Sequence, residues 1–139
     1  LEAGIAFNNA SVTLIHGMSR PIGALFHIPH GMSNAILMST CLRFAVSGAY
    51  DRFGDLGRAI GVADGDDGDE AAAWKFLDAL TALTRALKTP DLESYGVNRE
   101  EFFDCIDKMA HDAMESGSPQ NTMRDMTEKD VKELYRQLW

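Results

Sequence analysis

Three of the four histidines in this 139-residue chain lie close together in the sequence, at His16, His27 and His30. A neutral imidazole nitrogen is a common protein ligand of iron, zinc, copper and nickel. A second interpretation stays open, in which each imidazole is a core or boundary group that bonds to a backbone carbonyl. The chemistry to test first is therefore the binding of a divalent metal ion.

The spacing of His16 and His30 sets a geometric condition on a shared ion. A straight helix between these two positions would separate them by about 21 Å. Two nitrogen ligands of one ion lie only about 3–4 Å apart, since each metal–nitrogen bond measures about 2.0–2.1 Å. The chain must therefore reverse between them, and Pro29 favours this by disfavouring the helical region at Ile28. If the two histidines share an ion, we therefore expect their imidazole rings to converge on one point.

The segments that must position these histidines have the pattern of helices. Apolar residues recur at intervals of three and four with no alternating strand pattern, which predicts an all-α fold, a multi-helix bundle. Helices are expected over residues 2–17, about 30–46, 50–60 and about 69–87, with a kink or restart at Pro21. Two more are expected, one from a cap at Asn98 to Ala113 and one from a capping box at Thr127-Glu-Lys-Asp130 onward. The first of these has small and apolar residues on most faces, which predicts burial nearly all round.

Charge is distributed unevenly along the chain. Its 13 Lys and Arg and 21 Asp and Glu residues give a net charge of −8, yet residues 1–50 hold only Glu2, Arg20 and Arg43. Nucleic acids and anionic membranes require a basic face, so neither partner is expected. The uncharged run 21–42 contains histidine, asparagine, serine and threonine, which argues against a transmembrane span. Two widely separated cysteines and no signal-peptide pattern favour a cytoplasmic location.

Several stretches of the chain closely resemble the iron-containing alcohol dehydrogenase family. They are Ala3-Gly-Ile-Ala-Phe7-Asn-Asn-Ala-Ser11, His16-Gly-Met-Ser-Arg20-Pro-Ile-Gly-Ala24, Ile28-Pro-His30-Gly31-Met-Ser-Asn34-Ala and Thr127-Glu-Lys-Asp-Val-Lys-Glu-Leu-Tyr135. The resemblance implies a dinucleotide-binding domain followed by a helical domain, with a divalent metal held between them by one Asp and three His. On this resemblance His16 and His30 are the third and fourth ligands, Fe²⁺ is the expected metal and Zn²⁺ the alternative.

The resemblance also implies what the complete enzyme does. It is an alcohol dehydrogenase that uses NAD or NADP to oxidise a small alcohol, or to reduce an aldehyde, by hydride transfer. Residues 1–139 match only the later part of the family's helical domain, so we expect one truncated helical domain that is inactive alone. The alternative is a non-catalytic helical protein-interaction module derived from that family.

The same resemblance assigns two residues to the substrate side. Arg20 stands one helical turn after His16, where many family members carry another histidine, and its guanidinium is suited to a carboxylate or phosphate on the substrate. Phe7 matches a position that lines the family's substrate pocket. Without these roles, Arg20 would be a surface or ion-paired arginine and Phe7 a packing residue.

An incomplete helical domain would leave apolar faces uncovered around residues 3–17 and 32–46. Exposed apolar surface of more than about a few hundred Å² drives association between protein chains. We therefore expect a homo-oligomer.

Overall fold

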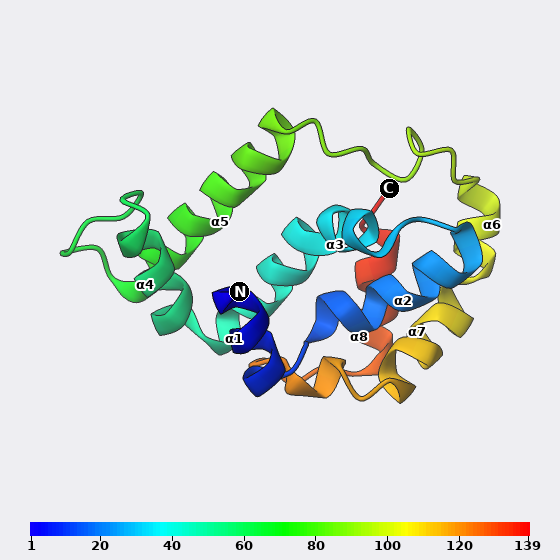
Figure 1. Ribbon diagram of the computed structural model, residues 1–139, viewed down its shortest axis with the longest axis horizontal. Coiled ribbons are helices and arrows are strands. Elements are labelled where there is room, and N and C mark those ends of the chain that lie inside the picture. The colour runs from blue at the N-terminus through cyan, green and yellow to red at the C-terminus, as the bar shows by residue number, and fades with distance from the viewer.

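The computed structural model describes residues 1–139 and contains helices without strands (Figure 1), which confirms the predicted all-α class. None of its helices has both the length and the apolar character needed to cross a membrane. In chain order the elements are α1 (Glu2–Ala10), α2 (Leu14–Phe26), α3 (His30–Ala45), the 3-10 turn η1 (Val46–Gly48), α4 (Tyr50–Ala59), α5 (Asp69–Ala86), α6 (Arg99–Asp104), α7 (Ile106–Glu115), the 3-10 turn η2 (Pro119–Asn121) and α8 (Glu128–Arg136).

The larger hydrophobic core lies where α2 packs against α3 and α7, and α7 packs against α8. It comprises 15 buried residues, among them Met18 of α2, Leu37 of α3 and Tyr135 of α8. The Tyr135 hydroxyl donates a hydrogen bond to the backbone carbonyl of Met18 at 2.8 Å. This bond and the apolar packing around it hold α2 against the bundle from the inside.

The helices α4 and α5 form a separate antiparallel pair at one end of the molecule (Figure 1). Their small core is built from Val46, Ala49, Phe53, Ala73 and Leu77. The backbones approach closely because Gly54 and Gly57 of α4 carry no side chain. A Cβ at Gly57 would lie 2.6 Å from the carbonyl oxygen of Ala72 on α5.

The predicted helix over residues 2–17 is wrong, because two helices occupy this stretch. Ser11, with φ at 66°, ends α1, and α2 begins at Leu14. The η2 region holds the connecting backbone. Asn121 Nδ2 donates to the Val12 carbonyl at 3.0 Å, and the Leu14 amide donates to Thr122 Oγ1 at 3.1 Å. These long-range hydrogen bonds compete successfully with local helix propensity.

Burial of the first helix was also predicted wrongly. No residue of α1 is buried, because no other helix packs closely against it. Ile5 and Phe7 expose 54% and 59% of their surface. The segment is apolar as the sequence shows, but no other helix of this chain covers its apolar side chains.

Two other helix boundaries differ from expectation. Pro21 does not restart the chain, since α2 continues through it to Phe26 while its buried face packs into the core. A proline in a helix interior removes one hydrogen bond, and the burial of Met18 and Ile22 on either side offsets that loss. The helix expected from Asn98 to Ala113 is divided into α6 and α7 at Cys105, although its capping residue Asn98 is confirmed.

The contact between α4 and α5 leads to a stability prediction. Gly57→Ala should lower the free energy of unfolding by about 1–3 kcal/mol, because the new methyl group meets backbone that cannot move without separating the helices. Gly65→Ala, in the loop before α5 with nothing within 4 Å of its Cβ position, is the matched control. Urea unfolding followed by circular dichroism measures both; equal midpoints for the two variants would contradict the prediction.

Candidate metal and substrate site

The structure brings His16 and His30 together across the turn between α2 and α3. His16 lies in the first turn of α2, and His30 is the first residue of α3. The reversal uses a left-handed conformation at His27, with φ at 54°, and an extended Pro29. The two ring centroids lie 5.0 Å apart with an angle of 58° between the rings. The predicted convergence of the His16 and His30 rings is confirmed. His27 forms the left-handed residue of the turn and is not part of the histidine pair.

Both ring nitrogens of His30 take part in hydrogen bonds, and these bonds indicate which nitrogen carries the proton. Ser19 Oγ donates to the His16 carbonyl at 3.2 Å, so the same oxygen accepts a hydrogen bond from His30 Nδ1 at 3.3 Å. The proton is thereby placed on Nδ1. The lone pair of Nε2 faces the Asn34 side-chain nitrogen at 3.2 Å. Metal-ligating histidines characteristically donate their other ring N–H to such a partner.

The geometry fits two ligands of one metal ion. Two imidazoles bound to one ion through bonds of about 2.0–2.1 Å have their ring centroids about 5 Å apart, as observed for His16 and His30. No group of three or more His, Cys, Asp or Glu residues is arranged to hold a metal in this chain. A catalytic site typically has three protein ligands, so this pair accounts for part of such a site.

The electrostatic surroundings of the pair are positive. Burial lowers the pKa of His16 below its ordinary value, and the nearby His30 and Arg20 lower it further. His16 is therefore neutral at pH 7, the form that binds metals. Arg20 is exposed and donates through Nη1 to Ser118 Oγ at 3.1 Å. It forms no ion pair, so of the two alternatives to a substrate role the structure excludes an ion-paired arginine and agrees with a surface arginine.

A cavity of about 300 Å³ opens beside His16. Phe7 of α1 and His16 of α2 line it together with Asn34 and Met38 of α3 and the connection between α1 and α2. Phe7 is thus a cavity-lining residue rather than a core residue. The cavity does not include His30 or Arg20 in its lining, although His30 contacts Asn34.

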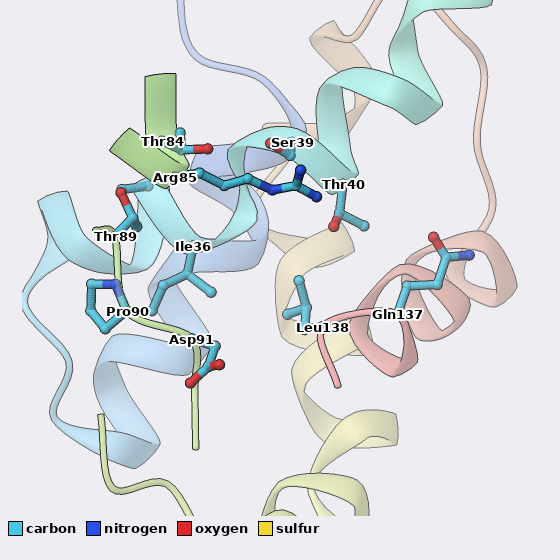
Figure 2. Close-up of a pocket in the computed structure, with 11 residues that line it drawn as sticks. Ile36, Ser39, Thr40, Thr84, Arg85, Thr89, Pro90, Asp91, Gln137 and Leu138 are labelled. Carbon is cyan, nitrogen blue, oxygen red and sulfur yellow. The ribbon is translucent and has the colours of Figure 1, made fainter. Parts of the chain in front are cut away.

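A second cavity, of about 220 Å³, lies on the opposite face of α3 (Figure 2). Ser39 and Thr40 of α3 line it, and the guanidinium of Arg85 extends toward them, with Asp91 and Gln137 farther out. It contains no histidine and no cysteine. The histidine pair and this cavity are therefore separate features.

The chain matches a known protein family over its whole length. The sequence model described as "Fe-containing alcohol dehydrogenase family, C-terminal" matches residues 1–139. The chain belongs to the iron-containing alcohol dehydrogenase family. It is 32% identical over 138 residues to lactaldehyde reductase of Escherichia coli K12, and 30% identical over 138 residues to 1,3-propanediol dehydrogenase of Citrobacter freundii. Each alignment covers 99% of this chain and 35% of the relative.

Solved structures of this family share the fold. A crystal structure described as 1,3-propanediol oxidoreductase superimposes with a TM-score of 0.89 at 28% identity, covering 99% of this chain and 35% of that one. Alcohol dehydrogenase from Oenococcus oeni gives a TM-score of 0.87 at 25% identity, with the same coverage. The chain spans about 35% of the length of the relatives it matches, so the likeness covers their helical C-terminal part.

Sequence reasoning missed three polar residues that position the family-like site. Ser19 and Asn34 bind the two ring nitrogens of His30, and Ser118 holds Arg20. Asn34 follows His30 by four residues, so helical spacing was a usable signal for that contact. Ser118 lies 98 residues from Arg20, and no sequence pattern connects them.

The lowered pKa of His16 predicts how the stability of the metal-free chain depends on pH. The unfolded chain, with an ordinary histidine pKa near 6.5, binds the His16 proton more readily than the folded chain. The free energy of unfolding should therefore fall as the pH is lowered through about 6.5 toward the folded-state pKa, and His16→Gln should reduce this fall. Urea unfolding in the presence of a chelator at several pH values measures the slope.

The control for this measurement is His27→Asn, because asparagine tolerates the left-handed backbone at that position. It should leave the His16 contribution in place. A slope that is the same in His16→Gln and in the unsubstituted chain would show that His16 does not titrate as described.

Proposed function

We propose that this chain is the metal-binding helical portion of an NAD- or NADP-dependent alcohol dehydrogenase, which oxidises a small alcohol or reduces an aldehyde. The observation that carries the proposal is the 5.0 Å approach of the His16 and His30 rings, with the His30 tautomer set by Ser19. Membership of the iron-containing family supplies the class of reaction. The relatives' names, lactaldehyde reductase and 1,3-propanediol dehydrogenase, support a small substrate.

In this proposal His16 and His30 hold a divalent ion, Fe²⁺ or alternatively Zn²⁺. When bound, the ion supplies a Lewis acid that favours the alkoxide form of an alcohol. Ser19 keeps the His30 proton on Nδ1, so that the Nε2 lone pair would bind the ion in place of the Asn34 amide that it contacts here. Phe7 and Arg20 lie on the substrate side. Two neutral imidazoles carry no charge to offset a divalent cation, so the remaining ligands include a carboxylate from outside this chain.

The nicotinamide cofactor requires a further unit. Nothing in residues 1–139 has the glycine-rich turn after a strand that cradles a dinucleotide pyrophosphate. We propose that a separate nucleotide-binding domain holds NAD or NADP and that hydride transfer takes place between the two domains. The free thiols of Cys41 and Cys105 support a reducing compartment, the cytoplasm.

The competing function is a non-catalytic interaction module derived from the same family. The exposed apolar side chains of Leu1, which precedes α1, and of Ile5 and Phe7 on α1 favour it. This alternative differs from the enzyme in its chemistry, because it requires neither a metal nor a nicotinamide.

Substitution of the histidine pair distinguishes the two functions. In the complete gene product, His16→Ala and His30→Ala should each lower metal affinity and kcat/KM at least about 100-fold, since each removes a direct ligand. His111→Ala, an exposed histidine on α7, is the matched control and should retain both. Elemental analysis gives the metal content, and the absorbance of reduced nicotinamide gives the rate with primary alcohols. A complete protein that binds neither metal nor nicotinamide would support the interaction module instead.

The chain of residues 1–139 by itself should bind Fe²⁺ or Zn²⁺ weakly and catalyse nothing. Two imidazoles are an incomplete ligand set, and the chain does not position a nicotinamide. Calorimetry with each metal and an assay with NAD or NADP and a panel of alcohols test this. Turnover above that of the His16→Ala/His30→Ala double variant would refute the need for further domains.

We also propose that the chain self-associates through its uncovered apolar surface. Ile5 and Phe7 of α1 are exposed together with the preceding Leu1, and a second copy is one way to bury them. Light scattering at micromolar concentration should give a dimer or larger species. Ile5→Glu should shift the mass toward one 15.3 kDa chain, whereas Glu2→Gln should not. A single-chain mass for the unsubstituted protein would contradict this proposal.

A further inference from the structure

Arg20 is a cation without an acidic partner beside the histidine pair. Four residues along α2 separate it from His16, which places both on the same helical face about 6 Å apart along the axis. Ser19, the residue before it, contacts His30. Seven of the other basic residues form ion pairs, but Arg20 contacts no carboxylate. Its guanidinium therefore retains donors for a bound anion.

The position of Arg20 is set by packing. Its Nη1 donates to the hydroxyl of Ser118, which is only 4% exposed. The next residue, Pro119, packs against Gly17 of α2 so closely that a Cβ at Gly17 would lie 2.8 Å from the proline ring. Because the loop that carries Ser118 is fixed against the same helix, this hydrogen bond orients the guanidinium beside the pair. A mobile surface arginine has no such support.

The surroundings favour a negative charge. The segment from residue 21 to residue 42 carries no Asp, Glu, Lys or Arg, and Glu2 is the one acidic residue among the first 50. The 16-residue helix α3 begins at His30, so the positive end of its dipole faces the same region. Neither side of the turn supplies a carboxylate to neutralise Arg20.

We propose that Arg20 binds an anionic group at the far end of the substrate, so that the substrate is a short hydroxy acid, its aldehyde acid, or a phosphorylated equivalent. The inference rests on the proposed function, because it places the reacting hydroxyl at the histidine pair. A spacing of about 6 Å along α2 separates that hydroxyl from the anionic group by a few carbon atoms. A guanidinium binds a carboxylate or a phosphate through two parallel hydrogen bonds.

Anion binding is tested on the metal-free chain, independently of catalysis. Succinate and inorganic phosphate are titrated into the ¹⁵N-labelled protein while NMR follows the ring signals of His16 and the Nε–H of Arg20. Saturable shifts are expected in the unsubstituted chain and should be absent for the His16 ring in Arg20→Gln. Arg52→Gln removes an equal charge from the exposed face of α4 and should bind as the unsubstituted chain does.

Substrate selectivity is tested in the complete, metal-loaded enzyme. Unbranched primary alcohols are compared with ω-hydroxy carboxylates and hydroxyalkyl phosphates of the same chain length. The ratio of kcat/KM for the anionic substrate to that for the neutral one should fall at least about tenfold in Arg20→Gln. It should fall less in Arg20→Lys, which keeps the charge and loses the paired geometry. In the unsubstituted enzyme, the anionic group, carboxylate or phosphate, that gives the larger of these ratios is the group that the natural substrate carries.

The outcomes separate this inference from the proposed function. His16 signals that do not respond to either anion, or that respond equally in Arg20→Gln, overturn the role of Arg20 whatever the enzyme catalyses. An enzyme that turns over neutral alcohols with an anionic preference unaffected by Arg20→Gln also overturns it, and the proposed function then stands. Saturable, Arg20-dependent anion binding in a complete protein without dehydrogenase activity supports the anion site and refutes the proposed function.

Discussion

The placement of the candidate site depends on one buried hydrogen bond, from the hydroxyl of Tyr135 on α8 to the backbone carbonyl of Met18 on α2. Burial raises the pKa of Tyr135 far above its ordinary value, so the hydroxyl stays protonated and remains a donor. Met18 is fully buried and lies on the side of α2 opposite to His16 and Arg20. Contacts that hold Met18 inward therefore direct those two residues outward.

The turn between α2 and α3 brings His30 next to the outward-facing side of α2. Ile28 is buried in the main core, which anchors the turn, while His27 takes the left-handed conformation that reverses the chain. Ser19, itself buried on α2, then contacts the first residue of α3. The histidine pair is thus held by contacts within the chain, an arrangement that would reduce the reorganisation required for the proposed metal binding.

The charge distribution leaves the histidine pair without a nearby carboxylate. An uncharged segment packs well inside a bundle, but it supplies no carboxylate for a divalent ion or for Arg20. The acidic residues lie mainly on the later helices and their loops, where they pair with lysine and arginine, as Asp67 does with Lys75 and Glu128 with Lys132. An anionic substrate would compensate the positive charge of Arg20, whereas a divalent ion would add positive charge and would therefore need a carboxylate from outside this chain.

The sequence by itself determined the helical class, most helix positions, the cap at Asn98, the capping box at Thr127 and the convergence of His16 with His30. The helical features follow from short-range periodicity and local capping, and the convergence follows from the family resemblance of the histidine motifs together with the reach of the chain. Only the tertiary structure decided that Ser11–Thr13 breaks the first helix, that Phe7 lines a cavity and that Ser118 orients Arg20. The helix break and the position of Arg20 depend on the segment 118–122, about a hundred residues away, and the Phe7 cavity depends on the packing of α2 and α3. Local sequence patterns contain no information about such contacts.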